Sequence, residues 1–131
     1  VEETVLSGRV VDREGELATV ETPAGRVRAL AGDAAGPEAD AMQVSVRADA
    51  VTLHDPADAP ATDATSARNR FAGEVAGVER GEAVARVVVD VGADAPLAAL
   101  VTTDSVEKLA LGPGARVVAS FKATATRATP G

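Results

Sequence analysis

Apolar and polar residues alternate along most of this chain, which is the pattern of β-strands that bury one face. Short runs rich in Gly, Pro and Asp separate the alternating stretches, as turns between strands do. The first half is therefore predicted to be a β-meander, a loop over residues 32–40 and a return strand that bends near residues 48–49. Its predicted strands cover residues 5–11, 17–21, 26–30 and 42–53.

The second half follows a polar segment that is predicted to be a linker. Residues 55–65 contain two prolines and three aspartates and offer little apolar surface to bury. A short helix is expected over residues 105–109, with Thr103 or Asp104 as its N-cap. The strands predicted after the linker cover residues 68–78, 83–91, 97–102, 116–121 and 124–127.

The two halves match each other as a degraded repeat. Residues 6–10 align with residues 71–75, and residues 46–50 align with residues 121–125, with a basic residue and an alanine in register. The predicted fold is all-β: two OB-like five-stranded Greek-key barrels in tandem, with a short helix in the second. The expected boundaries are a first, degenerate OB-like unit at 1–54, a linker at 55–65 and a second unit at 66–131.

Composition limits what the chain can contain. The hydrophobic residues are mostly Ala and Val, and Phe71 and Phe121 are the two aromatic residues, so the core must be built from small side chains. Cysteine is absent, which excludes disulfides and thiolate metal sites. No apolar run approaches the length of a membrane span, so we expect a cytoplasmic protein without direct membrane insertion.

Charge narrows the range of partners. The 20 acidic residues outnumber the 13 basic residues, for a formal net charge of −7. That field opposes nucleic-acid binding, where a basic face supplies most of the affinity. An acidic, lysine-poor surface is typical of proteins from salt-rich cytoplasm, although a GC-rich genome would produce a similar composition. In about 1 M salt the Debye length is about 3 Å, so distant carboxylates would not prevent an anion from binding to nearby donors.

Hydroxyl and basic side chains gather in three short runs, SARN at 66–69, TTDS at 102–105 and FKAT at 121–124. Together they offer hydroxyl donors, one guanidinium and one ammonium, which suits a small doubly charged oxyanion. Each feature also has an ordinary explanation taken alone. Arg68 and Lys122 could be surface charges, and a Thr-x-x-Ser pair at a strand end could simply cap a helix.

These runs resemble the Mop (molbindin) domain of molybdate- and tungstate-binding proteins. The resemblance covers about residues 66–127 and has several separated motifs in the family's order. Besides the three runs, it rests on Gly73, Val75, Val101, Leu109, Ala110, Leu111 and Gly114. The first half is a weaker match: residues 6–8 and 44–51 resemble the TOBE region at the C-terminus of molybdate/tungstate ABC-transporter ATP-binding subunits.

The resemblance implies an oxyanion site at an interface between protomers, without a catalytic residue, a bound metal ion or a cofactor. In this sequence the implied site consists of the Ser66 hydroxyl, the Ala67 N–H, the Arg68 guanidinium, the Thr102 and Ser105 hydroxyls, the Lys122 ammonium and the Ala123 N–H. The first half lacks both the SARN and the Thr-x-x-Ser motifs, so we expect no equivalent site there.

The function expected from this resemblance is a cytoplasmic molybdate- or tungstate-binding regulatory domain of an ABC importer ATPase subunit. It would have no enzymatic activity of its own, since any ATPase would lie in a separate upstream domain. Its partners would be the ATPase and permease subunits and a further copy of itself, in a homodimer or larger homo-oligomer. The alternative is a free-standing oxyanion storage protein or the effector domain of a molybdate-responsive regulator. A nucleic-acid-binding OB module would need a basic groove and stacking aromatics, which the sequence does not offer.

Overall fold

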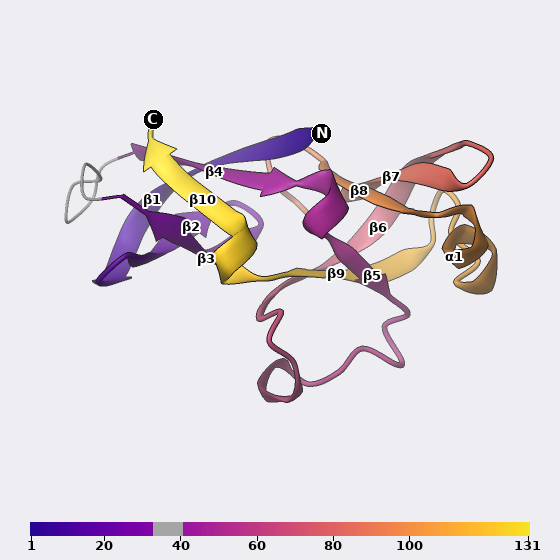
Figure 1. The fold of residues 1–131 in the computed structure, drawn as a ribbon, viewed down its shortest axis with the longest axis horizontal. Coiled ribbons are helices and arrows are strands. Elements are labelled where there is room, and N and C mark those ends of the chain that lie inside the picture. The colour runs from indigo at the N-terminus through magenta and orange to yellow at the C-terminus, as the bar shows by residue number, and fades with distance from the viewer. Residues whose placement is uncertain (33–40) are drawn as a thin grey trace.

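The computed structural model describes residues 1–32 and 41–131 and shows two β units side by side (Figure 1). Most of the predicted loop at 32–40 lies outside the described residues. The strands are β1 (Glu3–Glu14), β2 (Leu17–Thr22), β3 (Gly25–Ala31), β4 (Ala41–Arg47), β5 (Thr52–His54), β6 (Asn69–Arg80), β7 (Val84–Asp90), β8 (Leu97–Thr102), β9 (Arg116–Phe121) and β10 (Thr126–Pro130). The helices are α1 (Thr103–Lys108) and the 3-10 turns η1 (Ala48–Ala50), η2 (Thr62–Ala64) and η3 (Ala123–Ala125).

The first unit is a closed barrel and the second is a five-stranded sheet. The barrel has the order β1-β2-β3-β10-β4 and closes through the antiparallel pairing of β4 with β1. The second sheet has the order β5-β9-β6-β7-β8. Because the barrel is closed, its order can also be written from β10 as β10-β4-β1-β2-β3. This order matches β5-β9-β6-β7-β8 strand for strand, with β10 as the counterpart of β5 and β1 to β4 as the counterparts of β6 to β9. The prediction of an all-β fold with two OB-like five-stranded units is confirmed.

The last strand of each half belongs to the other half's sheet. β5 comes from the first half but pairs with β9, and β10 comes from the second half but pairs with β4 and, in parallel, with β3. The sequence had placed residues 52–54 in the first unit and residues 124–127 at the end of the second. That assignment is wrong for both strands, because the two sheets exchange their closing strands.

The internal repeat is visible in the backbone. The pairing of β1 with β2 shifts register between Val10 and Asp12, and that of β6 with β7 shifts between Val75 and Gly77. Each first strand also carries a glycine where the neighbouring strand passes very close. A Cβ built on Gly73 would lie 2.6 Å from the Asp90 carbonyl oxygen, and Gly8 is equally crowded by β2. The two units therefore share their local irregularities as well as their strand order.

The core consists mostly of small aliphatic side chains, as the composition predicts, and it includes both phenylalanines. Phe71 and Phe121 pack edge to face with ring centroids 5.8 Å apart. An ion pair links the residue before β1 to the second sheet: the Nε and Nη2 atoms of Arg86 donate to the Glu2 carboxylate at 2.6 and 2.7 Å. Among the described residues, no helix is long and apolar enough to cross a membrane.

Candidate functional site

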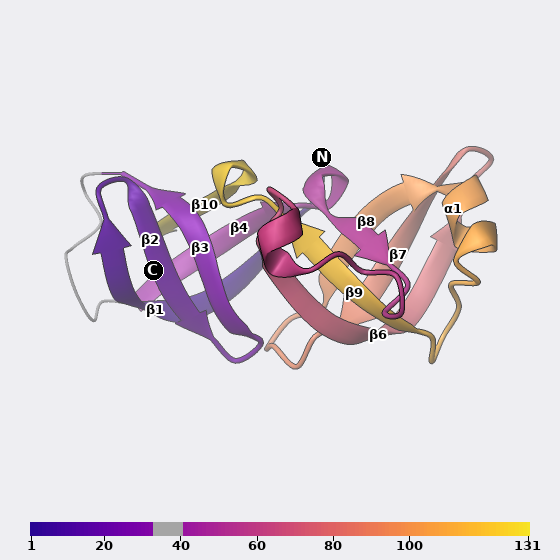
Figure 2. The ribbon, with the colours of Figure 1, turned by 90° about the horizontal axis from the view of Figure 1, so that it is seen from below.

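Two of the predicted site segments lie side by side at one end of the second sheet. Asn69, the first residue of β6, pairs with Phe121, the last residue of β9. Arg68 immediately precedes Asn69 and Lys122 immediately follows Phe121, so both basic residues lie just beyond this pair, at the same end of the sheet. Figure 2 shows this end of β6 and β9 next to the first barrel.

This end of the sheet carries two cations without an acidic partner. Arg68 and Lys122 are exposed, and neither forms an ion pair within the part of the chain that the structure describes. The Arg68 Nε atom has a long hydrogen bond to the Thr65 carbonyl oxygen, at 3.4 Å. We call residues 66–68 together with Lys122 and Ala123 the cation edge. Two neighbouring positive charges without a carboxylate produce a local potential that attracts anions.

The two predicted backbone donors differ in their present partners. The Ala67 N–H donates to the Thr65 Oγ1 atom at 3.1 Å, so it is engaged within the chain. Ala123 begins η3, and its counterpart in the repeat is Ala48, the first residue of η1. The Ala48 N–H donates to the Glu2 carbonyl oxygen at 2.9 Å, whereas the described second half has no corresponding bond from Ala123 to residue 67.

The predicted hydroxyls belong to a helix start. Thr102 is the N-cap of α1: its Oγ1 atom accepts a hydrogen bond from the Ser105 N–H at 3.1 Å and lies 2.8 Å from the Ser105 Oγ atom. The ordinary explanation of the Thr-x-x-Ser pair as a helix cap is therefore confirmed, whereas the prediction of Thr103 or Asp104 as the cap of a helix that begins at Ser105 is wrong. Thr103 is instead anchored to the β6–β7 turn, where its Oγ1 atom donates to the Gly81 carbonyl oxygen at 3.1 Å.

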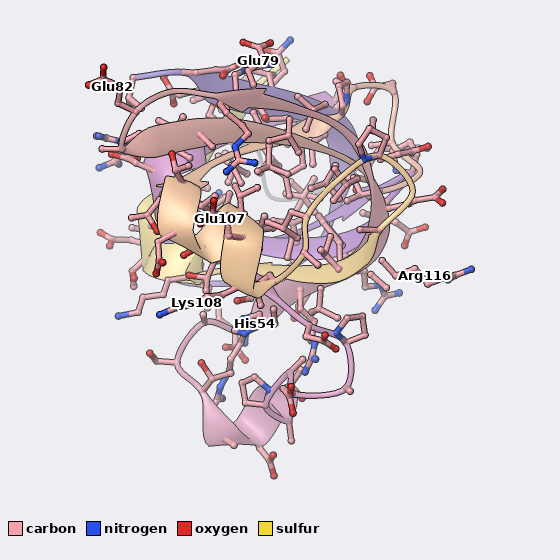
Figure 3. The ribbon with its side chains drawn as sticks, turned by 90° about the vertical axis from the view of Figure 1, so that its right-hand side faces the viewer. His54, Glu79, Glu82, Glu107, Lys108 and Arg116 are labelled. Atoms are coloured by element: carbon pink, nitrogen blue, oxygen red, sulfur yellow. The ribbon has the colours of Figure 1, made fainter. Side chains whose placement is uncertain are left out.

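One chain does not bring these hydroxyls to the cation edge. Thr102 pairs with Val84, at the end of the sheet where β6 finishes with Arg80. β6 has 12 residues, a path of about 40 Å at about 3.3 Å per residue, and the cation edge lies at its opposite end. Figure 3 looks onto the helix end, with Glu107 and Lys108 on α1. The structure therefore joins two of the three predicted segments and separates the third.

Comparison with known proteins identifies the family. Residues 65–128 match the TOBE domain. Molybdenum-pterin-binding proteins 1 and 2 of Clostridium pasteurianum are each 36% identical to this chain over 59 residues, which are 45% of this chain and 87% of each relative. The chain belongs to the Mop/TOBE family. The match lies in the second half, called the Mop unit below, so the resemblance predicted for residues 66–127 is confirmed.

A solved structure extends the likeness of the Mop/TOBE chain to its full length. The cytoplasmic molybdate-binding protein ModG, in a crystal form with molybdate bound, superposes with a TM-score of 0.83. The superposition covers 98% of this chain and 96% of ModG at 22% sequence identity. The tandem fold is thus shared with a known structure.

The Mop unit and the first unit differ in charge at one of two equivalent positions, where the first unit has Glu3 and the Mop unit has Arg68. In the first unit, Glu3 pairs with Arg47 across β1 and β4, where the Mop unit has Arg68 beside Lys122. The Arg47 guanidinium also binds the Asp49 carboxylate with two contacts, at 3.1 and 2.9 Å. The hydrogen bond from Arg47 holds the pKa of Asp49 below its ordinary value. The cation of the first unit is thereby neutralised by its own neighbours.

Two surface grooves of the Mop/TOBE chain lie apart from the predicted residues. They have volumes of about 630 and 360 Å³ and occupy equivalent places in the repeat, one over Gly8 beside Glu21 and the other over Gly73 beside Asp90. None of the predicted site residues lines either groove. The grooves follow from the close strand approach at the two glycines rather than from the chemistry of the cation edge.

Sequence reasoning gave no role to Asn69, although it is part of the SARN run. Asn69 is 4% exposed and its side-chain amide is hydrogen-bonded to the first barrel. A signal was present in the sequence: Asn69 occupies an inward position, two residues before Phe71, where an apolar residue would be usual. A buried polar side chain needs hydrogen-bond partners, and the sequence could not say which strand supplies them.

Proposed function

We propose that this chain binds molybdate or tungstate at a site shared between two copies. One copy supplies the cation edge, with Ser66, Ala67, Arg68, Lys122 and Ala123, and a second copy supplies the Thr102 and Ser105 hydroxyls. The observation that carries the proposal is the position of Arg68 and Lys122, which adjoin the paired ends of β6 and β9 without an ion-pair partner among the described residues, in a chain of net charge −7.

The donor set suits a tetrahedral dianion. The guanidinium and the ammonium match its charge of −2, and hydroxyls and backbone N–H groups can bond to the remaining oxygens without adding negative charge. Molybdate and tungstate have the same charge and shape, so the residues that bind one should bind the other. The Thr102 and Ser105 hydroxyls bond to each other in the isolated chain, and either proton can turn toward a ligand oxygen.

A second copy that covers the cation edge would raise the affinity of the site for the anion. Exposed charge pairs contribute only about 0–1 kcal/mol in water, and the overall negative charge of the chain opposes an approaching anion. Covering the cation edge would exclude water and lower the local dielectric, which strengthens the same contacts several-fold. The hydroxyls that complete the donor set lie at the far end of the sheet, so they must come from another copy.

The relatives support a free-standing binding protein. Each molybdenum-pterin-binding protein is little longer than the stretch that matches, so a Mop unit occurs there without an attached ATPase. ModG, described as a cytoplasmic molybdate-binding protein, has the same tandem fold over its whole length. We accordingly place the function in the cytoplasm, as binding or storage of the oxyanion rather than catalysis.

Calorimetric titration with molybdate, tungstate and sulfate tests the proposal, because the chain has no Trp or Tyr to report binding by fluorescence. We expect saturable heat with molybdate and tungstate, at about one ligand per chain. The Arg68→Ala variant should weaken both by about 2–4 kcal/mol, since it removes a charge-assisted partner from a desolvated dianion. Failure of wild type to bind either oxyanion would overturn the proposal.

The second candidate is the regulatory domain of an ABC importer ATPase subunit, supported by the TOBE match. In that setting the chain would act with ATPase and permease subunits and report the oxyanion level to the transporter. Light scattering separates the two candidates. A free-standing binder should form a closed trimer or hexamer with several sites, whereas a transporter or regulator domain should form a dimer.

A further inference from the structure

The cation edge is fastened to the first barrel by a buried amide. The Asn69 Oδ1 atom accepts a hydrogen bond from the Arg28 N–H at 2.9 Å, and the Asn69 Nδ2 atom donates to the Arg28 carbonyl oxygen at 2.8 Å. One side chain therefore satisfies both backbone groups of a residue on β3, as a neighbouring strand would. Since Asn69 directly follows Arg68, this contact fixes where the backbone of residues 66–68 lies relative to the barrel.

The backbone at Lys122, on the other side of the cation edge, also has a side-chain hydrogen bond. The Thr126 Oγ1 atom donates to the Lys122 carbonyl oxygen at 2.8 Å, and Thr126 is fully buried at the start of β10. β10 belongs to the first barrel by pairing, as β3 does. Polar contacts to two strands of that barrel thus set the backbone on both sides of the Arg68 and Lys122 pair.

We propose that Asn69 is a positioning residue of the oxyanion site, and that through it the first barrel serves as the frame of a site to which it contributes no ligand. The inference rests on the proposed function for its ligand, but its geometry does not. Two hydrogen bonds to the same residue restrict rotation of the Asn69 side chain, and they therefore fix the position of the backbone from which the Arg68 side chain extends. A site prepared in this way loses less freedom when the anion binds.

The repeat supplies a matched control. Thr4 is the counterpart of Asn69: it is buried at the start of β1, and its Oγ1 atom accepts a hydrogen bond from the Ala98 N–H at 3.0 Å, across the same junction in the opposite direction. Thr4 follows Glu3, which lies opposite Arg47, so it adjoins the neutralised end of the first unit. Both residues tie the units together, and only Asn69 adjoins the cation edge.

The test compares Asn69→Ala, Asn69→Thr and Thr4→Ala with wild type. Molybdate affinity is measured by calorimetry, and amide hydrogen exchange is measured for the segments 65–69 and 121–124. Groups that orient a ligating side chain typically change affinity about 10- to 100-fold when they are removed. We expect a loss of that size in Asn69→Ala with faster exchange in both segments, and a change within about threefold in Thr4→Ala. Asn69→Thr keeps one acceptor, as Thr4 does, and should fall in between.

The outcomes separate the two claims. Equal affinity and equal exchange in wild type and Asn69→Ala would overturn the positioning role. Equal affinity losses in Asn69→Ala and Thr4→Ala would also overturn it, because the effect would then be general loosening of the junction. If wild type binds no oxyanion, the proposed function fails. The exchange measurement still decides whether Asn69 fixes the cation edge, and faster exchange confined to Asn69→Ala would support that.

Discussion

Removing the Lys122 ammonium tests the cation edge most directly, because the repeat provides a second basic residue in the same fold position. Lys122 follows β9 and Arg47 ends β4, and each is followed by an alanine that begins a 3-10 turn. The two differ in their partners. Arg47 is bound to Asp49 by two contacts, whereas Thr124 takes the place of Asp49 after Lys122.

The expected size of the effect follows from those partners. In Lys122→Ala a desolvated dianion loses one of two cations, and truncating one member of such a pair costs about 2–5 kcal/mol. A hydrogen bond to a charged group contributes about 1.5–3 kcal/mol by itself. We therefore expect a loss of about 2–4 kcal/mol, which is about 30- to 1000-fold in the dissociation constant. Arg47→Ala should leave the affinity unchanged, because that guanidinium is already neutralised.

The assay is calorimetric titration of wild type, Lys122→Ala and Arg47→Ala with molybdate at one fixed ionic strength. A concentration near 0.15 M sodium chloride sets a Debye length of about 8 Å and limits the contribution of distant carboxylates. Circular dichroism confirms that each variant is folded. Equal losses in both variants would show that only net charge matters, and no loss in Lys122→Ala would show that the ligand binds elsewhere; either result refutes the reasoning.

The fold gives three further predictions. Phe121→Ala removes a 1% exposed ring that packs on Phe71 and should lower the free energy of unfolding by about 3–5 kcal/mol, measured by urea denaturation. Gly73→Ala forces a Cβ against the Asp90 carbonyl and should destabilise by about 1–3 kcal/mol, whereas Gly77→Ala meets no atom within 4 Å and should be close to neutral. The hydrogen bond from Arg86 holds the pKa of Glu2 below its ordinary 4.5, so this carboxylate stabilises the fold above about pH 4.5 and stops doing so as the pH falls through the lowered value. Glu2→Gln should therefore have a lower urea midpoint than wild type at pH 7, and the difference should shrink as the pH is lowered below 4.5; a difference that stays constant with pH would contradict the assignment.

Local sequence signals were sufficient for the strands and turns. Alternation placed β2 and β3 to within a residue or two, and the bend near residues 48–49 is the 3-10 turn η1. The exchange of closing strands was not predictable in this way. β5 and β10 are short, with 3 and 5 residues, and an alternating pattern says which face is buried but not which sheet the strand joins. The choice among the three candidate N-caps has a similar cause, since Thr102, Thr103 and Asp104 are all good caps and the pairing of Thr102 with Val84 decides among them.

The site was predictable in its residue types but not in its assembly. The SARN and FKAT runs lie at the ends of two strands that pair with each other, and the structure places these two runs together. The distance of Thr102 from them depends on the length and direction of β6, which no motif records. The role of Asn69 was hidden because its partner Arg28 lies 41 residues away on a strand of the other unit.

The exchanged strands explain why the second unit would need the first unit for its fold, although the basic residue of the first unit is neutralised. Without the first half, the second sheet would lose β5 at its edge, and β10 would lose both β3 and β4 as partners. The anchors of the cation edge would be lost too, since Asn69 bonds to β3 and Thr126 lies on β10. The positions that distinguish the two units, Glu3 and Asp49, are exposed and make no contribution to the core. The fold thus depends on the strands of the first half and not on its surface charges, which is consistent with an exposed Arg47 that is paired with Asp49.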